Sequence, residues 1–285
     1  MKILIKPNFD KPGSLACTRD TLKMLGGLGF APMLDESVAN AVELEEGCAA
    51  GPLEELLPQC DLLLTIGGDG TILHAVQKAV RIGKPLLGIN TGRIGFLTQI
   101  EADELHHLRL LKEGKYGYLR RMMLEVTLFQ DGREETFAAL NDVVFTRGAS
   151  DRLVEIDIRC QDNPVAAHRA DGVIFCTPTG STAYNLAAGG AIADPRLDLI
   201  LLTAICPHSH FNHTLLLSPE NEFEVREVPG NNKTGLVLTV DGERAGVMRL
   251  GAHAVIKRSA RRAEFIDFGL RDFYNCINKK LRIRK

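Results

Sequence analysis

The segment Gly67-Gly68-Asp69-Gly70-Thr71 constrains the fold more than any other part of this chain. It follows a short apolar run, 62–66, that is typical of a buried strand, and it precedes apolar residues at helical spacing over 72–80. Glycines between a strand and a helix let a ligand approach the backbone, and the start of the helix offers unpaired N–H groups to phosphate. We expect Thr71 to cap the first turn of this helix.

Asp69 does not suit a loop that only holds phosphate. An ionised carboxylate repels phosphate unless it binds a metal ion or accepts a proton from a group beside the phosphates. The segment also lacks the Lys-Ser/Thr ending of a P-loop and the G-x-G-x-x-G spacing of a dinucleotide fingerprint. The structural alternative is a tight turn in which Asp69 only bonds local amides. The pattern favours phosphoryl transfer, and this alternative stays open.

Strands and helices alternate up to about residue 115, which predicts a parallel sheet covered by helices. The strands are expected at 3–5, 32–34, 61–66 and 85–89, and the helices at 18–28, near 43–46 and at 71–81. Later strands are expected at 123–129, 136–145, 153–159, 172–176, 222–228, 236–240, 255–257 and 264–267, before a helix from 271 onward. We predict a parallel α/β domain (1–117), a mainly β domain (118–257) and a C-terminal segment (258–285) that packs back on the first domain.

Charge and cysteine content exclude several kinds of partner. The chain has 34 basic and 36 acidic residues, which gives no nucleic-acid footprint, and the basic residues from Lys279 onward are expected to form a solvated helix end. The longest apolar run, 197–206, is too short to span a membrane and contains Asp198. Seven scattered cysteines without a C-x-x-C pair, and no signal-peptide pattern after Met1, predict a cytoplasmic protein with free thiols.

A second group of polar residues follows the expected strand 172–176. The segment 177–184, Thr-Pro-Thr-Gly-Ser-Thr-Ala-Tyr, brings four hydroxyls to the start of an expected helix, where they could bind ribose hydroxyls or phosphate. N-capping, which needs one hydroxyl, is the alternative. Arg169 and Asp171 occupy alternate positions and so share one face of a strand, either as an ion pair or as partners for a sugar or an amide. The pair Asn141-Asp142 could form hydrogen bonds with a ribose diol or with an adenine edge, or it could form a simple turn.

Three histidines, His208, His210 and His213, have the spacing H-x-H-x-x-H. No carboxylate lies within that stretch of sequence, and a structural zinc site needs a closed set of four ligands. We therefore expect no resident metal ion.

These motifs, in this order, resemble those of the NAD kinase family, which phosphorylates the 2′-hydroxyl of the adenosine ribose of NAD to make NADP. The matching segments are 67–71, 90–92, 95–97, 140–142, 171–172, 177–184, 188–190, 206–209 and 240–242. The Gly-Gly-Asp-Gly-Thr segment alone is shared with diacylglycerol and sphingosine kinases, whereas the Pro-Thr-Gly-Ser-Thr-Ala-Tyr run is far more specific. The likeness covers most of the chain and implies a Rossmann-like first domain.

The resemblance implies a role for each matching residue. Asp69 would take the proton from the 2′-hydroxyl, and the donor would be ATP, or polyphosphate, with Mg²⁺ carried by ATP. Residues implied to bind NAD are Gly70, Thr71, His74, Asn141, Asp142, Arg152, Arg169, Asp171, Thr182, Ala183, Tyr184, Asn185, Leu186 and Ala187. Because an aspartate is a weak base, positioning and neutralisation of the donor phosphates would supply most of the rate. The family also implies a homodimer or homotetramer formed through the β domain.

The chain departs from the family pattern on the adenine side. His213-Thr214 stands where Arg-Pro or Arg-Thr is usual, Asn185 and Ala187 where Ser is common, and Ala191 where Pro is common. Two other functions compete. A lipid kinase of the diacylglycerol type would need an apolar acyl pocket, whereas the hydroxyls of 177–182 suit a polar sugar. A catalytically silent dinucleotide-binding regulator would bind NAD without turnover, and an intact Asp69 argues against it.

Overall fold

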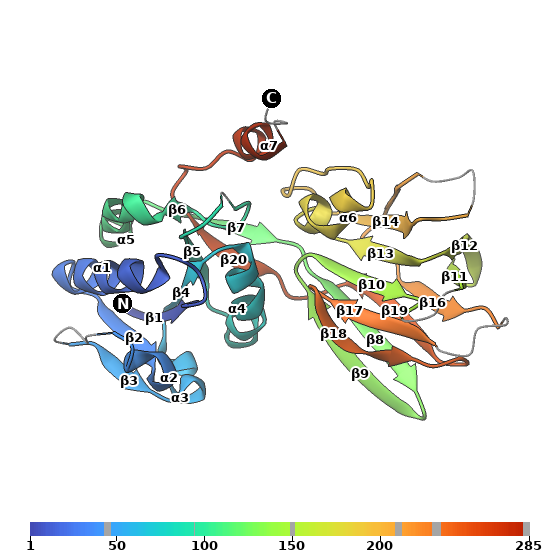
Figure 1. Ribbon diagram of the computed structural model, residues 1–285, viewed down its shortest axis with the longest axis horizontal. Coiled ribbons are helices and arrows are strands. Elements are labelled where there is room, and N and C mark those ends of the chain that lie inside the picture. Colours follow the sequence, from blue (N-terminus) through green and yellow to red (C-terminus); the bar gives the residue numbers. More distant parts are fainter. Residues whose placement is uncertain (43–46, 94, 149–151, 209–212, 230–234, 282–285) are drawn as a thin grey trace. The chain divides into compact units, whose positions relative to one another are not determined.

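The computed structural model describes residues 1–42, 47–93, 95–148, 152–208, 213–229 and 235–281, so the helix expected near 43–46 lies outside the described residues. The chain forms two compact units, Met1–Arg120 with Ala263–Lys285, and Arg121–Arg262 (Figure 1). The predicted divisions at 117/118 and 257/258 lie a few residues from these limits. None of the described helices is long and apolar enough to cross a membrane.

The first unit is built on one sheet with the strand order β3-β2-β1-β4-β5-β20-β7, and β6 pairs with β5. The pairs β1–β2, β2–β3, β1–β4, β4–β5, β5–β6 and β5–β20 are parallel, so the predicted parallel α/β fold is confirmed. The strands are β1 (Lys2–Pro7), β2 (Ala31–Asp35), β3 (Ala49–Gly51), β4 (Leu62–Gly67), β5 (Leu86–Asn90), β6 (Ile100–Glu101), β7 (Gly117–Arg121) and β20 (Ala263–Asp267).

Two helices of 14 residues form because their apolar residues recur at helical spacing and are buried against this sheet. Helix α4 contacts β4 and β5, and α1 contacts β2 and β4. The helices of the unit are α1 (Ser14–Gly27), α2 (Glu36–Ala39), α3 (Leu53–Leu56), η1 (Leu57–Gln59), α4 (Asp69–Ile82), η2 (Ala102–Leu108), α5 (Arg109–Lys112) and α7 (Phe273–Leu281).

The chain returns to the first unit with a strand. β20 pairs in parallel with β5 through Phe265 and Leu86, and Ile266 is buried in the core of the first unit. The prediction that the C-terminal segment returns to the first domain is confirmed. The strand expected at 264–267 therefore completes the parallel sheet before α7 begins.

The second unit contains two antiparallel sheets. Their strand orders are β15-β14-β13-β10-β17-β18 and β12-β11-β16-β19-β8-β9. The strands are β8 (Leu124–Gln130), β9 (Arg133–Ala139), β10 (Asp142–Thr146), β11 (Val154–Cys160), β12 (Asn163–Ala170), β13 (Gly172–Cys176), β14 (Ile200–Ile205), β15 (Leu215–Leu217), β16 (Phe223–Glu227), β17 (Leu236–Val240), β18 (Glu243–Met248) and β19 (His253–Arg258). The expectation of a mainly β domain is confirmed.

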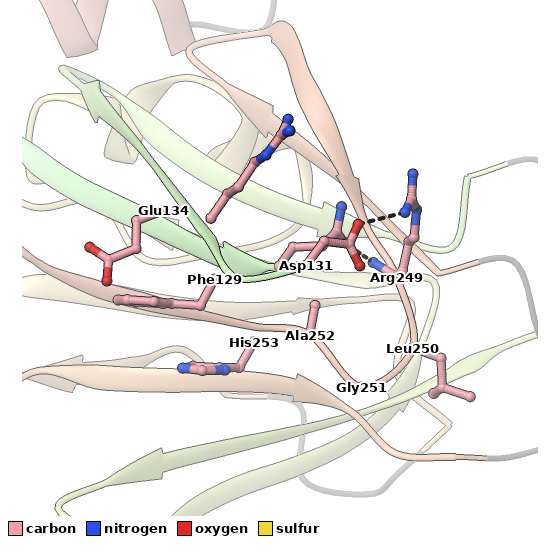
Figure 2. Close-up of a pocket in the computed structure, with 11 residues that line it drawn as sticks. Phe129, Asp131, Glu134, Arg249, Leu250, Gly251, Ala252 and His253 are labelled. Atoms are coloured by element: carbon pink, nitrogen blue, oxygen red, sulfur yellow. Dashed lines mark hydrogen bonds and ion pairs between the residues drawn. The ribbon is translucent and has the colours of Figure 1, made fainter.

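The turns at one end of this unit enclose a pocket of about 560 Å³. It is lined by the β8–β9 turn and the segment between β18 and β19, where Arg249 pairs with Asp131 and Phe129 stacks on His253 (Figure 2). No residue that the sequence predicts to bind a ligand lines this pocket.

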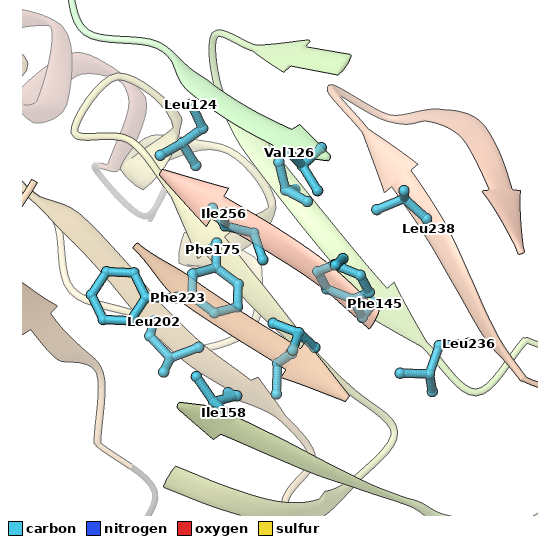
Figure 3. Packing of buried hydrophobic residues seen from close by; sticks show 14 of the residues in the cluster. Leu124, Val126, Phe145, Ile158, Phe175, Leu202, Phe223, Leu236, Leu238 and Ile256 are labelled. Carbon is cyan, nitrogen blue, oxygen red and sulfur yellow. The ribbon is translucent and has the colours of Figure 1, made fainter. Parts of the chain in front are cut away.

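The core of the second unit is formed by apolar side chains from both sheets. Phe145, Phe175 and Leu238 come from one sheet, and Phe223 and Ile256 from the other, and all are buried in one cluster (Figure 3). Alternate residues of these strands supply this cluster, as the period of a strand requires.

The strand expected over 136–145 is wrong as a single element. It is two strands, β9 and β10, which belong to different sheets. The chain breaks at Leu140 and Asn141, whose N–H groups both donate to the side chain of Asp241 and so cannot continue a ladder.

Candidate active site

Asp69 lies at the carboxyl end of β4, in the turn that leads into α4. Gly67, the last residue of β4, is paired with Asn90, the last residue of the neighbouring β5. Ligands of open parallel sheets bind at this edge. α4 begins at Asp69 with Gly68 as its N-cap, and the Thr71 N–H donates to the Gly68 carbonyl oxygen at 2.9 Å. The Thr71 hydroxyl oxygen accepts from the Gly68 N–H at 3.4 Å, so Thr71 caps the first turn as expected, as the third helical residue of a capping box.

The carboxylate of Asp69 is held by the loop after β5. Its Oδ2 accepts from the Phe96 N–H at 2.8 Å, and its Oδ1 accepts from the Leu97 N–H at 3.1 Å. Gly95 is required beside it, because a Cβ there would overlap Asp69 Oδ1. The alternative in which Asp69 bonds amides is therefore part of the structure. Since each carboxylate oxygen has a second lone pair, these bonds orient the group and leave it able to accept a proton.

Two predicted residues of this turn are open to solvent and one is not. Gly70 is exposed, and nothing lies within 4 Å of the position that a Cβ would take. His74 is exposed one turn further along α4. Thr71 is 4% exposed, and its hydroxyl is bonded within the turn to the Gly68 N–H.

The C-terminal helix adds a residue that the sequence did not point to. Lys280 Nζ lies 3.7 Å from Asp69 Oδ2 and 4.1 Å from the centre of the Phe96 ring. Lys279 and Lys280 are exposed, as expected of a solvated helix end, and the Lys280 side chain keeps 29% of its surface while its ammonium pairs with Asp69. No local sequence signal could reveal this pair, because the two residues are far apart in the chain.

The second unit carries a separate cluster around Asp241. The Asp241 carboxylate accepts N–H groups from Leu140 at 2.8 Å, Asn141 at 2.7 Å and Asp142 at 3.2 Å. Asp241 follows β17 at a positive φ of 49°, in an Asp-Gly turn. Its matching position in the family pattern was the only sequence signal for it, and its role here is to fix the 140–142 turn.

The 177–182 segment is bonded to that turn. Thr177 N–H donates to the Asn141 carbonyl oxygen at 2.9 Å, and the Thr177 hydroxyl donates to the Leu140 carbonyl oxygen at 2.6 Å. Gly180 lets the two segments meet, because a Cβ there would overlap the Asn141 carbonyl oxygen. The expected continuous helix is wrong: the chain forms η3 (Gly180–Thr182) and α6 (Tyr184–Ala187), separated by the non-helical Ala183.

The hydroxyls of this segment bond within the protein. The Ser181 hydroxyl donates to the Pro178 carbonyl oxygen at 2.6 Å, and that of Thr182 to the Thr179 carbonyl oxygen at 3.4 Å. Thr177, Thr179 and Ser181 are buried and Thr182 is half-buried. Among these four, only Thr182 has substantial surface for a ligand.

Asn185 is also buried, and its side chain is hydrogen-bonded to Ala191, another position at which the chain departs from the family pattern. Its side-chain amide donates to the Ala191 carbonyl oxygen at 2.9 Å, and its oxygen accepts from the Thr203 hydroxyl at 2.7 Å. The hydroxyls of Thr203 and Thr214 are 2.9 Å apart, and Thr214 in turn accepts from the Ala191 N–H at 3.2 Å. Two departures, Asn185 and Ala191, therefore lie in one hydrogen-bonded network, and Thr214, which the family pattern allows, completes it.

The exposed part of this loop lies near two carboxylates. Ala183, Tyr184 and Ala187 are exposed, and Leu186 is half-buried. Burial raises the pKa of Tyr184, and the neighbouring Cys206, Asp142 and Asp171 raise it further. The charges of Asp142 and Asp171 therefore disfavour ionisation of the Tyr184 hydroxyl.

Asp142 and Asp171 have different surroundings. Asp142 is 4% exposed, and burial together with the charge of Asp241 raises its pKa to about 7. Asp171 pairs with Arg147 at 2.6 Å, so the suggested pair with Arg169 is wrong. Arg169 and Arg152 are both exposed.

The histidine motif gives no metal site in the part of the chain that the structure describes. His210 lies outside the described residues, and no group of three or more His, Cys, Asp or Glu side chains within them is arranged to hold a metal ion.

Comparisons with known proteins match this architecture. The model of the ATP-NAD kinase N-terminal domain matches residues 51–116, and that of the ATP-NAD kinase C-terminal domain matches 140–268. The NAD kinase of Caldanaerobacter subterraneus subsp. tengcongensis is 36% identical over 282 residues, 98% of each chain. The NAD kinase of Desulforamulus reducens is 40% identical over 240 residues, 84% of this chain and 82% of that protein.

Two solved structures share the fold. The yeast NADH kinase complexed with NADH superposes with a TM-score of 0.89 at 25% identity, covering 100% of this chain and 90% of that one. The NAD kinase from Archaeoglobus fulgidus in complex with ATP superposes with a TM-score of 0.75 at 23% identity, covering 98% and 99%.

Proposed function

The chain belongs to the NAD kinase family and is a phosphotransferase that acts on NAD, and from this premise we propose that Asp69 is its general base and ATP its phosphate donor. In this reaction the bond between the γ-phosphorus and ADP breaks, the 2′-oxygen of the adenosine ribose bonds to that phosphorus, and the 2′-hydroxyl proton passes to Asp69.

The observation that carries the proposal is the position of the Asp69 carboxylate. It stands at the first residue of α4, where the helix start presents N–H groups, and the two amides of Phe96 and Leu97 fix its direction. A fixed carboxylate beside a phosphate-binding helix start has the geometry that proton removal from a hydroxyl requires.

Mg²⁺ enters this proposal as part of the substrate MgATP. In that complex the phosphate oxygens of the donor would hold the ion. The helix start would contact phosphate rather than adenine, so polyphosphate is a second donor to test.

The second-unit cluster would bind NAD. We propose that Asn141 and Asp142 bond ribose hydroxyls and that the exposed Tyr184 ring packs on the nucleoside, next to Thr182, Ala183, Leu186 and Ala187. Asn185 would act through its buried network, which shapes that loop. Three further residues of the second unit are proposed to bind NAD: Arg152, Arg169 and Asp171. Two residues of the first unit, Gly70 and His74, are also proposed to bind it. A homodimer or homotetramer in the cytoplasm also remains a prediction.

The test measures NADP formation from NAD, ATP and Mg²⁺ for the wild type, Asp69→Asn and the control Asp20→Asn. Asp20 is exposed on α1, so its variant makes the same chemical change away from the site. We expect a loss of about a hundredfold or more in kcat for Asp69→Asn and a change within about twofold for the control. Because Asn places a donor opposite an amide N–H, the melting temperature is measured in parallel.

Each other outcome has a distinct meaning. Equal rates for wild type and Asp69→Asn would retain the function and remove Asp69 from the role of base. NAD binding by the wild type without NADP formation would refute the kinase reaction and favour a silent regulator. Phosphorylation of diacylglycerol in preference to NAD would favour the lipid kinase.

A further inference from the structure

The C-terminal helix α7 is anchored to the segment that follows the site loop. Arg271, just before α7, donates from Nη2 to Glu101 at 3.0 Å and to Glu104 at 2.7 Å, and from Nε to the Gln99 carbonyl oxygen at 3.1 Å. Glu101 also accepts from the side-chain amide of Asn90 at 2.6 Å. The base of α7 is thus tied to the carboxyl end of β5, next to the strand that carries the Asp69 turn.

The other end of α7 places an ammonium group beside Asp69. Phe273, the first residue of α7, lies 6.2 Å from Phe96 between ring centres, and Lys280 lies over the Phe96 ring at 4.1 Å. Phe96 therefore contacts both ends of the helix while its N–H binds Asp69. The Lys280 ammonium is 3.7 Å from Asp69 Oδ2, within the range of an ion pair but longer than a hydrogen bond.

We propose that Lys280 is a phosphate-binding residue of the reaction, which moves from Asp69 to the transferred phosphoryl group; this inference rests on the proposed function. A base lies about 3 Å from the oxygen whose proton it removes, and that oxygen lies about 3–3.5 Å from the phosphorus that it attacks. A flexible side chain that ends 3.7 Å from the base reaches the oxygens of that phosphoryl group with a small rotation.

The change in charge during the reaction favours the movement of Lys280 from Asp69 to the phosphoryl group. As Asp69 accepts the proton it becomes neutral, and its attraction for Lys280 falls. At the same time the phosphoryl group carries charge over its three equatorial oxygens and remains anionic on the ribose. Lys280 keeps its proton and forms no covalent bond, and only its anionic partner changes. A positioned cation that follows the developing charge lowers the barrier to transfer.

The Asp69–Lys280 pair also allows an opposite role, in which Lys280 masks the base and restrains the enzyme. The two roles predict opposite changes in kcat when the charge is removed. A purely structural role, through the contact with Phe96, predicts that NAD binding and thermal stability change together with the rate.

The test compares Lys280→Gln, Lys280→Arg and the control Lys279→Gln, in which the neighbouring exposed lysine loses the same charge. For each full-length variant, kcat, the KM for MgATP, the Kd for NAD without ATP, and the melting temperature are measured. We expect Lys280→Gln to lower kcat/KM for MgATP by at least about tenfold, Lys280→Arg to recover most of it, and Lys279→Gln to stay within about twofold. The Kd for NAD should not change.

Several results would overturn the inference. A Lys280→Gln variant whose kcat and KM for MgATP both equal those of the wild type would remove Lys280 from the reaction, and a higher kcat would make it an inhibitory contact. Equal losses in the Gln and Arg variants, with weaker NAD binding and a lower melting temperature, would make it structural. In all three cases the wild type still makes NADP, whereas a wild type that makes none would refute the proposed function itself.

Discussion

Replacing Asp142 by Asn should make the protein more stable at pH 8 while it weakens NAD binding. Asp142 is 4% exposed, and its pKa is raised to about 7, first by burial and then by the charge of Asp241. The folded protein therefore holds an ionised carboxylate at alkaline pH that would be better solvated in the unfolded chain.

The sign and the size of the effect follow from the pKa. Between pH about 4 and about 7 the folded state binds more protons than the unfolded state, so stability falls as pH rises through this window. The penalty is complete above pH 7. A shift from 3.8 to about 7 corresponds to a ceiling of about 4 kcal/mol at about 1.4 kcal/mol per pKa unit. Asn carries no charge, so the gain of the variant should be near zero at pH 4 and reach about 2–4 kcal/mol at pH 8.

Hydrogen exchange of the second unit is a suitable assay. The amides of Val143 to Phe145 in β10 lie between β13 and β17 and report the opening of that unit, independently of the first. The protection of these amides is compared from pH 5 to pH 8 for the wild type, Asp142→Asn and the control Glu134→Gln. Glu134 is exposed on β9, so the control loses one charge without a change in burial.

Two results would refute this reasoning. A constant difference between wild type and Asp142→Asn over the whole pH range would show that titration of Asp142 is not its cause. An Asp142→Asn variant that is more stable at pH 8 but binds NAD as well as the wild type would show that the buried charge does not serve binding. The expected combination is higher stability with NAD affinity reduced by at least about tenfold, since a buried charged group that costs stability is typical of functional sites.

Two further substitutions test the frameworks of the clusters. Asp241→Asn should lower the free energy of unfolding by about 2 kcal/mol, because the amide nitrogen of Asn cannot accept one of the three N–H groups that Asp241 binds. The same variant should lower the pKa of Asp142, because the charge of Asp241 is lost, and a titration by NMR would show this. Unchanged stability and pKa would contradict this. Arg271→Gln should lower the local stability of α7 by about 1–2 kcal/mol and increase proteolysis within this helix, while the Kd for NAD stays unchanged. Equal proteolysis of the wild type and the variant would contradict the anchoring role of Arg271.

Much of the fold could be predicted because its strands carry clear local signals. β4, β5 and β13 are buried along their whole length, and their sequences are short, mainly apolar runs. β12 and β18 gave no such signal, since both are edge strands with largely exposed or half-buried residues.

The candidate site could be predicted as far as single segments allow. Asp69, Asn141 and Asp142 stand at the ends of apolar strands, and that position can be read from sequence. Their partners cannot, because Asp241 and Lys280 approach them only through the sheet topology and the return of the chain to the first unit. Arg147 was missed for the same reason: its pairing with Asp171 requires the alignment of β10 with β13.

The hydroxyl-rich loop shows why residue type alone misdirects a prediction about binding. A run of Thr and Ser was expected to offer its hydroxyls to a ligand, yet Thr177 and Ser181 are fully buried and bond to backbone carbonyls. Such bonds satisfy buried polar groups and fix the loop before any ligand arrives. Little conformational entropy of the loop is therefore lost when a ligand binds. The same reasoning applies to Ala191, which stands where Pro is common in the family pattern. Ala191 has an N–H that Pro lacks, and the Thr214 hydroxyl accepts it, so this group is satisfied within the network.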